Sequence, residues 1–363
     1  MSGENLASVS SALSTFFQEP LHHQWNRTAV LLGMLAARGD IGDGKGKQVA
    51  FDVEFSGNTA TTVAEGSDVA DAEYASDVNV PAILPWAHYR TSFKISETEY
   101  AAALSSGGTP EMLRRLFEER VMAGGAKLMR TIEQDLMTGT GVDSSGNPTI
   151  VGIYGGALVA SGDYAGISAT TYTEWASNIL GNGGLTRALT SDLLAQADAE
   201  IFAAASEPWD VLITSAGVAR KYEGLFTSAT VPLIRMNDGA SRPDYGLGNA
   251  NGPTHQPLGL FYKGQPVTRV ATNPVHKLAL LNTKKIQIKY LPHPQSPNDA
   301  AYSQIVEGQA SNGFGQIQAT QIPIRIAMLA KTGESYKVMM TVTIQAAITR
   351  PNAMALVTDI SET

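Results

Sequence analysis

Residues 109–139 read TPEMLRRLFEERVMAGGAKLMRTIEQDLMTG, and this stretch decides the fold. Thr109 suits the N-cap of a helix and Pro110 suits its first turn, while Gly139 suits the turn that ends it. Between them, apolar residues recur at helical spacing: Leu113, Leu116, Phe117, Val121, Leu128, Ile132 and Leu136. The pattern predicts one helix over 109–138, roughly 44 Å long, with a bend or a close contact at Gly124-Gly125.

Two alternating segments precede this helix. Val49, Phe51, Val53 and Phe55 alternate with small or polar residues, and a second segment runs from 81 to 96. The residues between them, 56–80, make a connection that is long for a compact domain. We therefore expect a long two-stranded arm. Before it, the pattern predicts short helices over 8–17 and 28–38, and the Gly-rich residues 39–47 indicate a flexible connection.

The chain beyond the long helix predicts a mixed α/β unit. Residues 191–205 form an amphipathic pattern, 209–216 a buried strand and 218–226 a short helix. Strands then dominate, and no internal repeat is visible. The expected strands are 265–271, 277–281, 286–290, 321–329 and 337–348. The last has apolar residues at alternate positions over eleven residues, which predicts a long strand: Val338, Met340, Val342, Ile344, Ala346 and Ile348.

This order of elements resembles the Hong Kong 97-type fold shared by tailed-phage major capsid proteins and encapsulin shells. The resemblance covers nearly the whole chain. It rests on the order of the elements and the residue patterns within them, not on a signature motif. The stretches that carry it are 86–95, 109–139, 209–215 and 336–350. It implies an α+β fold with an N-arm, an extended β-loop, a long spine helix, a peripheral domain and an axial domain.

The resemblance also implies a division of the chain. The expected parts are an N-terminal arm (1–40), an extended loop (41–100), a peripheral domain (101–180) with its spine helix (109–138), an axial domain (181–285), further peripheral strands (286–350) and a C-terminal segment (351–363). Only about 40 residues precede the extended loop, whereas some family members carry a cleaved scaffolding segment there. We expect either a separate scaffolding protein or a segment missing from this chain.

Composition narrows the function classes. Charged residues make up 17% of the 363 residues, below the usual quarter, and Gly numbers 35. Few charges and many small residues suit a subunit that buries its surface against copies of itself. The net charge of −8 argues against a dedicated nucleic-acid binder. With no cysteine, disulfides and thiolate chemistry are excluded, and we expect a soluble protein without a signal peptide or membrane span.

No enzymatic motif emerges from the sequence. The patterns GxSxG, HExxH and GxxxxGK[ST] are absent. His22 and His23 are adjacent, so on a helix they point apart and cannot share a metal. Carboxylates on the long helix, such as Glu133 and Asp135, lie among basic residues and are interpreted as surface ion pairs. We assign no catalytic, cofactor-binding or metal-binding residue, and no cofactor.

The extended loop supplies the candidate contact residues. Its stretch 56–84 holds acidic residues and no Lys, Arg or His, so it is either a solvated acidic loop or an arm that docks on a neighbour's basic surface. Alternation places Trp86, His88 and Arg90 on one face, where they either pack beneath the arm or contact another subunit. The candidate intersubunit residues are Glu65, Asp68, Asp71, Glu73, Asp77, Trp86, His88 and Arg90.

The resemblance implies a structural subunit that self-assembles into the icosahedral shell around the double-stranded DNA of a tailed phage. The alternative is an encapsulin-like bacterial nanocompartment, and a third hypothesis is a soluble α/β enzyme. Expected partners are copies of itself in hexamers and pentamers, a separate scaffolding protein, a portal, with or without a decoration protein, and DNA contacted non-specifically, with no membrane. The expected location is the virion capsid, assembled in the host bacterial cytoplasm.

Overall fold

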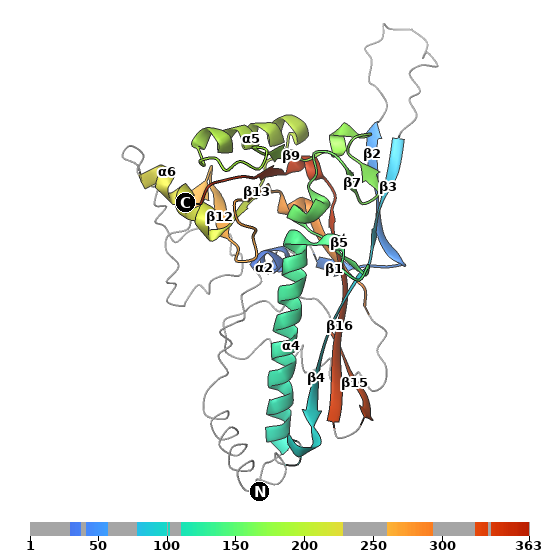
Figure 1. Ribbon diagram of the computed structural model, residues 1–363. Helices are drawn as coiled ribbons and strands as arrows, with labels where there is room; N and C mark the ends of the chain where they lie inside the picture. The colour runs from blue at the N-terminus through green and yellow to red at the C-terminus, as the bar shows by residue number, and fades with distance from the viewer. Residues whose placement is uncertain are drawn as a thin grey trace, which may run out of the picture.

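The computed structural model describes residues 30–37, 41–56, 78–99, 101, 110–227, 260–292, 324–332 and 335–362. Figure 1 shows an elongated subunit in which one long helix lies beside long strands, and a second unit of sheet and helices lies near its far end. The predicted helix over 8–17 falls outside the described residues. The one predicted over 28–38 is confirmed as α2 (Val30–Ala37).

The long helix is present as predicted. It is α4 (Pro110–Thr138), 29 residues without interruption, and it dominates the lower half of the subunit in Figure 1. A Cβ atom added at Gly124 would lie 2.9 Å from the sulfur of Met340. The glycine pair therefore marks a close contact between α4 and the strand that carries Met340, which is one of the two outcomes the sequence predicts.

That strand, β16 (Ser335–Ile348), is the central strand of a five-stranded sheet. It pairs antiparallel with its neighbours β4, β14 and β15, and β1 adds to β14 in parallel. The bounds of these four strands are β1 (Ile41–Asp43), β4 (Ala87–Ser96), β14 (Ile286–Tyr290) and β15 (Arg325–Thr332). The predicted long strand is confirmed. Its burial alternates at the start, where Val338 and Met340 are buried while Lys337 is exposed, but from Val342 to Ile348 both faces are buried, polar Gln345 included.

A six-stranded sheet forms the second unit, in the order β11-β12-β10-β13-β17-β9. Its strands are β9 (Asn178–Leu180), β10 (Val211–Thr214), β11 (Leu260–Tyr262), β12 (Gln265–Arg269), β13 (Leu278–Leu281) and β17 (Ala355–Val357). Helices α5 (Ser191–Ala205) and α6 (Ala216–Thr227) cover one face and share a core with Leu212 and Leu280. The other face, with Val211 and Ala279, joins the main core shared with the first sheet.

The predicted two-stranded arm is confirmed at its base. Strand β2 (Gln48–Ser56) pairs antiparallel with β3 (Val78–Pro85) from Gln48↔Pro85 onward. Phe55 stacks on Tyr172 at 4.2 Å between ring centroids, which holds the arm against the subunit. Figure 1 shows the arm at the end of the subunit away from the start of α4.

Smaller elements link these parts. Between α4 and the second sheet lie β5 (Thr140–Val142), β6 (Pro148–Val151), η2 (Ile153–Ala157), β7 (Asp163–Tyr164), β8 (Ile167–Ser168) and η3 (Thr173–Trp175). Two 3₁₀ turns join the sheets: η4 (Thr283–Lys285) and η6 (Pro351–Ala353).

Two expectations about the N-terminal half need correction. Residues 41–43 form strand β1 and the Gly44 N–H donates to the Tyr290 carbonyl at 2.6 Å, so the flexible connection expected over 39–47 is wrong for its described part. The segment 81–96 is not one arm strand, because it breaks at Trp86 and its second half, β4, leaves the arm to pair with β16.

Candidate intersubunit surface

Trp86 lies where β3 ends and β4 begins, and it is buried within its own subunit, with 5% of its surface exposed. Its indole N–H donates to the Gly46 carbonyl at 3.0 Å. A Cβ atom at Gly44 would lie 2.1 Å from the Trp86 ring, so only glycine lets the chain pass this close. Trp86 therefore anchors the Gly-rich segment to the subunit, which matches the alternative of packing beneath the arm.

His88 and Arg90 lie on β4 and are exposed. His88 Nδ1 forms a hydrogen bond with the Thr343 hydroxyl at 2.9 Å across the strand pair. The structure thus brings these two residues onto one exposed face and separates them from Trp86. The expectation that all three share that face is wrong, because the strand breaks at Trp86.

More basic residues extend this exposed face. Lys94 of β4 lies directly opposite Lys337 of β16, and both are exposed. Like charges directly opposite on a sheet destabilise the pair, and no described carboxylate forms an ion pair with them or with Arg90. We call Arg90, Lys94 and Lys337 the basic strip. Residues so far apart in the chain meet only through strand register, so sequence patterns did not reveal it.

Lys94 and Lys337 lie on the face of the sheet away from α4. Thr91 pairs with Met340, and both side chains lie at the α4 contact near Gly124. Successive side chains of a strand alternate between faces, so Lys94, three residues after Thr91, lies on the other side. Arg90 also lines a small hollow with Lys127 and Thr131 of α4. The acidic candidates Glu65, Asp68, Asp71, Glu73 and Asp77 fall outside the described residues, between β2 and β3.

Glu133 corrects the interpretation of the carboxylates on the long helix. It is 1% exposed, and its carboxylate accepts hydrogen bonds from the backbone N–H groups of Val30 at 3.0 Å and Leu32 at 3.4 Å. The Thr272 hydroxyl adds a third at 3.3 Å. Glu133 therefore holds the first turn of α2, where unpaired N–H groups need an acceptor. Burial raises the pKa of Glu133 to about 7, although these hydrogen bonds act to lower it.

Asp135 also points inward. It accepts a hydrogen bond from the Tyr89 hydroxyl at 2.7 Å, which joins α4 to β4. Burial raises the pKa of Asp135, and burial followed by the adjacent Asp135 raises the pKa of Tyr89. Neither Glu133 nor Asp135 is a surface ion pair. The spacing of charged residues along a helix does not predict which face of the helix is buried by the rest of the chain.

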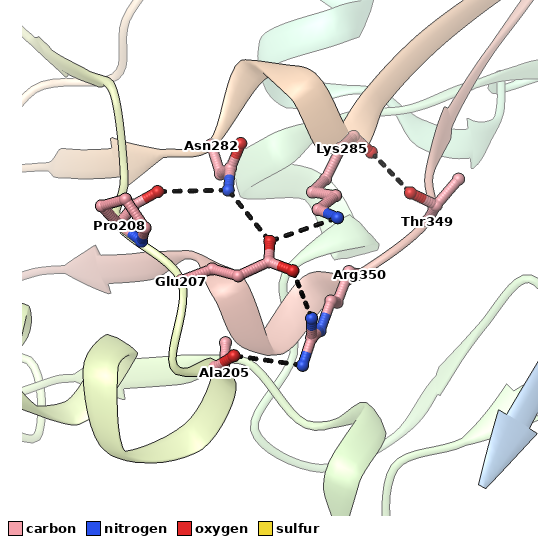
Figure 2. A network of polar contacts seen from close by, with 7 residues as sticks. All are labelled: Ala205, Glu207, Pro208, Asn282, Lys285, Thr349 and Arg350. Atoms are coloured by element: carbon pink, nitrogen blue, oxygen red, sulfur yellow. Dashed lines mark hydrogen bonds and ion pairs between the residues drawn. The ribbon is translucent and has the colours of Figure 1, made fainter.

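A polar network sits where the two sheets are joined. Figure 2 shows the Glu207 carboxylate, just after α5, between Lys285 and Arg350. Lys285 ends the turn that leads from β13 to β14, and Arg350 lies on the return from β16 to β17. The Thr349 N–H donates to the Lys285 carbonyl at 2.9 Å. The two connections between the sheets, β13 to β14 and β16 to β17, are therefore also hydrogen-bonded to each other.

The end of α5 contributes to the same network. Arg350 donates to the Ala205 carbonyl at 3.2 Å, and Asn282 donates to the Pro208 carbonyl at 3.2 Å, both visible in Figure 2. A cation at the last turn of a helix is favoured by the helix dipole. The ion pairs are partly exposed, so each is worth only ~0–1 kcal/mol. Together these contacts join the end of α5 to both connections between the sheets, and so they hold the two sheets in one arrangement.

The described residues contain no group of three or more His, Asp or Glu side chains that could hold a metal ion. No helix in the described part of the chain is long and apolar enough to cross a membrane.

Known proteins resemble this chain in structure but not detectably in sequence. No protein-family model and no curated protein matches the chain. Among solved structures, the chain matches the cyanophage A-1(L) capsid asymmetric unit with a TM-score of 0.70 at 19% identity, over 96% of this chain and 98% of that chain.

Two further shells match over similar lengths. The SrpI encapsulin of Synechococcus elongatus PCC 7942 gives a TM-score of 0.54 at 11% identity, covering 98% of this chain and 96% of that one. The capsid of a native GTA particle gives 0.53 at 13% identity, covering 97% and 98%.

These likenesses define the class of fold. The chain has the fold of phage capsid and encapsulin shell proteins, as its element order predicts. Within that class it is more similar to the cyanophage capsid subunit than to the encapsulin or the GTA capsid.

Proposed function

We propose that this chain is a structural subunit that self-assembles into the icosahedral shell enclosing the double-stranded DNA genome of a tailed phage. The observation that carries the proposal is the match to the cyanophage capsid over 96% of this chain and 98% of that one. Because both chains are covered almost end to end, the likeness extends to the arm, the long helix and both sheets. A shared core motif alone would not give such coverage.

An encapsulin-like nanocompartment is the second candidate, since an encapsulin also matches over the whole chain. Its TM-score of 0.54 against 0.70 for the cyanophage capsid favours the phage shell. A shell role, and not catalysis, also accords with the lack of any enzymatic motif in the sequence.

The proposal extends to partners and location. We assign the chain to hexamers and pentamers of itself in the virion capsid, assembled in the host bacterial cytoplasm. A separate scaffolding protein and a portal would act in assembly, with or without a decoration protein. We also keep the division into N-arm, extended loop, peripheral domain and axial domain as part of this proposal.

Electron microscopy of the expressed and purified protein tests the function. Closed icosahedral particles are expected, and particles recovered from infected cells should contain nucleic acid. Particles that hold a cargo enzyme and no genome would favour the encapsulin. A monomer or small oligomer under native conditions, with no particle in any condition, would refute the shell proposal.

We further propose that the acidic stretch of the extended loop contacts the basic strip of a second copy, beside His88. The stretch carries five carboxylates without a cation, and the strip carries exposed cations without a described carboxylate. Opposite charges across an interface fix its register and exclude wrong partners more than they add affinity. Repetition over a closed lattice lets a weak contact suffice.

Neutralising the five carboxylates should weaken the shell while leaving the subunit folded. The variant carries Asn or Gln at Glu65, Asp68, Asp71, Glu73 and Asp77. Exposed ion pairs contribute only ~0–1 kcal/mol each and are screened by salt, so the wild-type shell should also lose stability as salt rises. Thermal disassembly at several salt concentrations measures both effects.

A control neutralises carboxylates elsewhere on the subunit. Asp163→Asn with Glu174→Gln removes two exposed carboxylates on β7 and η3, and shells of this variant should behave like wild type. It is compared with a two-site variant of the acidic stretch, Glu65→Gln with Asp68→Asn, so that both variants change the charge by two. Unchanged thermal and salt tolerance in the five-site variant would mean that the acidic stretch is a solvated surface.

Shells should come apart into full-length monomers on a denaturing gel. The chain has no cysteine for disulfides, and residues 56–84 have no lysine that could form an isopeptide bond from the extended loop. Boiled particles run beside the unassembled subunit make the measurement. A ladder of dimers to hexamers would contradict this expectation.

A further inference from the structure

Residues 358–362 cross from the end of β17 to the first turn of α6, where Figure 1 shows the red end of the chain. The segment forms backbone hydrogen bonds with two separate parts of the second unit. The Thr358 N–H donates to the Leu180 carbonyl at 3.1 Å, and the Ile360 N–H donates to the His276 carbonyl at 3.0 Å. The Ile360 side chain is fully buried in the core of that unit. We call residues 358–362 the clasp, because they join loops that are far apart in the chain.

Asp359 holds the first end of the clasp. Its carboxylate accepts hydrogen bonds from the backbone N–H groups of Asn182 at 2.8 Å and Gly184 at 3.2 Å, in the loop between β9 and α5. The hydrogen bond from Asn182 is the main cause of a lowered pKa of Asp359, and the charge of Arg187 lowers it further. The carboxylate is therefore held in its ionised form by donors that belong to another loop.

Glu362 holds the second end. Its carboxylate accepts hydrogen bonds from the Ser215 hydroxyl at 2.5 Å and from the His276 backbone N–H at 2.8 Å. Ser215 directly precedes α6, and the N-terminus of a helix favours a negative charge. Burial acts to raise the pKa of Glu362, but the hydrogen bonds from Ser215 and His276 outweigh burial and lower it. The titratable and charged groups that face this carboxylate are His276 and Arg220.

The contact with α6 depends on a glycine. A Cβ atom at Gly217, in the first turn of α6, would overlap the carboxylate of Glu362, so a larger residue would displace it. Gly224 lies in the same helix, and a Cβ atom there would have nothing within 4 Å. The two glycines of α6 therefore differ in whether the clasp lies against them.

Local backbone strain opposes the closed clasp. Asp359 and His276 both have positive φ angles, 63° and 62°, which residues other than glycine adopt at a cost in free energy. Segments of a folded protein can open locally at a lower cost than global unfolding. The hydrogen bonds to the two carboxylates thus keep closed a segment that would otherwise relax.

We propose that the clasp detaches from the second unit in acid, or when Glu362 is displaced, while the sheet beneath it stays folded. Detachment uncovers the position that Ile360 fills in the core. This inference concerns contacts within one subunit, and it stands whether or not the chain forms a shell.

The sign of the pH dependence follows from the two carboxyls. Both have a lower pKa in the folded subunit than their ordinary values of 3.8 for Asp359 and 4.5 for Glu362. Their contribution is therefore full above pH 4.5 and is lost as the pH falls through the lowered values. Glu133, whose pKa is raised, acts in the opposite sense, so acid should release the clasp and not α2.

A single thiol measures the opening. The chain has no cysteine, so Ile360→Cys introduces one buried thiol, which a dithiodipyridine reagent labels in acid as well as at neutral pH. The reference is Leu280→Cys, a fully buried position of β13 in the same sheet, which reports unfolding of the sheet itself. As the pH falls below 3.8, labelling of Ile360→Cys relative to Leu280→Cys should rise about tenfold or more, because hydrogen bonds to charged groups are the strong ones.

Two further changes open the clasp at neutral pH. Gly217→Ala should speed labelling of Ile360→Cys about tenfold, since it displaces the carboxylate of Glu362. Its matched control is Gly224→Ala, which should leave the labelling rate unchanged. Both changes add a methyl group that favours the helix, so helix propensity alone predicts no difference between them. Asp359→Asn with Glu362→Gln should label fast at neutral pH and lose the acid dependence.

Three results would overturn the inference. Equal labelling of Ile360→Cys and Leu280→Cys at every pH would mean that the clasp opens only when the sheet unfolds. Equal rates in Gly217→Ala and Gly224→Ala would mean that the contact of Glu362 with α6 does not hold it. Hydrogen exchange of residues 358–362 in chains without the thiol repeats this comparison, and unchanged protection in Gly217→Ala would exclude the clasp independently of the reporter.

Discussion

Replacing Leu128 with proline is expected to abolish shell assembly and to leave little soluble subunit. Leu128 lies in the middle of α4, is 3% exposed and belongs to the main core. Proline there removes a backbone hydrogen bond and clashes with the preceding turn, at a cost of ~3 kcal/mol or more. The lost leucine side chain adds roughly 2–5 kcal/mol, because the cavity closes only in part.

Such a loss is comparable to the whole stability of a typical domain, about 5–15 kcal/mol. Soluble yield, helical circular dichroism and particle counts by electron microscopy would measure it. Leu128→Met is the matched control, since a volume-conserving change in the core costs less than about 1.5 kcal/mol. A proline variant that still forms particles would show that α4 does not hold the subunit together.

Glu133→Ala is expected to detach α2 from α4. The change leaves the N–H groups of Val30 and Leu32 buried without their acceptor. Each buried donor left unpaired costs ~1–3 kcal/mol, so a total of ~3 kcal/mol or more is expected. Denaturant unfolding measures the loss, and hydrogen exchange over 30–37 shows whether it is local. Unchanged protection of α2 would contradict the role given to Glu133.

The same residue gives a pH dependence of defined sign. Burial raises the pKa of Glu133 from 4.5 to about 7 in the folded subunit. The folded state therefore holds this proton more tightly than the unfolded state. The contribution of Glu133 to stability is full below pH 4.5 and is lost as the pH rises to about 7, by ~3 kcal/mol.

Glu133→Gln isolates this contribution, because its amide keeps one oxygen acceptor but does not titrate. The difference in unfolding free energy between wild type and Glu133→Gln should change between pH 4.5 and 7 and stay flat outside that window. Carboxyls with a lowered pKa, such as Glu99 and Asp198, act in the opposite sense but cancel in the difference. A flat difference over the whole range would refute the expected shift.

Sequence patterns predicted the helices and strands that depend mainly on residues close together in the chain. The 29 residues of α4 follow from a proline start, a helical apolar period and a glycine end. Strands β2 and β16 follow from strict alternation. Such patterns arise because the residues that form one face of a helix or strand are near neighbours in the chain. In β16 the pattern does not show that the second half of the strand, Val342 to Ile348, is buried on both faces.

Apart from the pairing of the two arm strands, contacts between distant segments were not predicted. Lys94 meets Lys337 because β4 leaves the arm and pairs with β16 in one register. Glu133 reaches α2 across 103 residues of chain, and Glu207 meets Arg350 across 143. Trp86 was expected to share one face with His88 and Arg90, because alternation cannot show that a strand breaks there and turns the indole onto Gly44.

The sequence by itself thus determined the order of the elements, their approximate bounds and the class of fold, because helix and strand periods are properties of adjacent residues. Only the tertiary structure decided which faces are covered and which charges meet. Burial and electrostatic pairing depend on packing between segments far apart in the chain. That is why an apparent surface carboxylate, Glu133, is a buried helix anchor, and why Lys94 and Lys337 lie opposite each other although they are far apart in the chain.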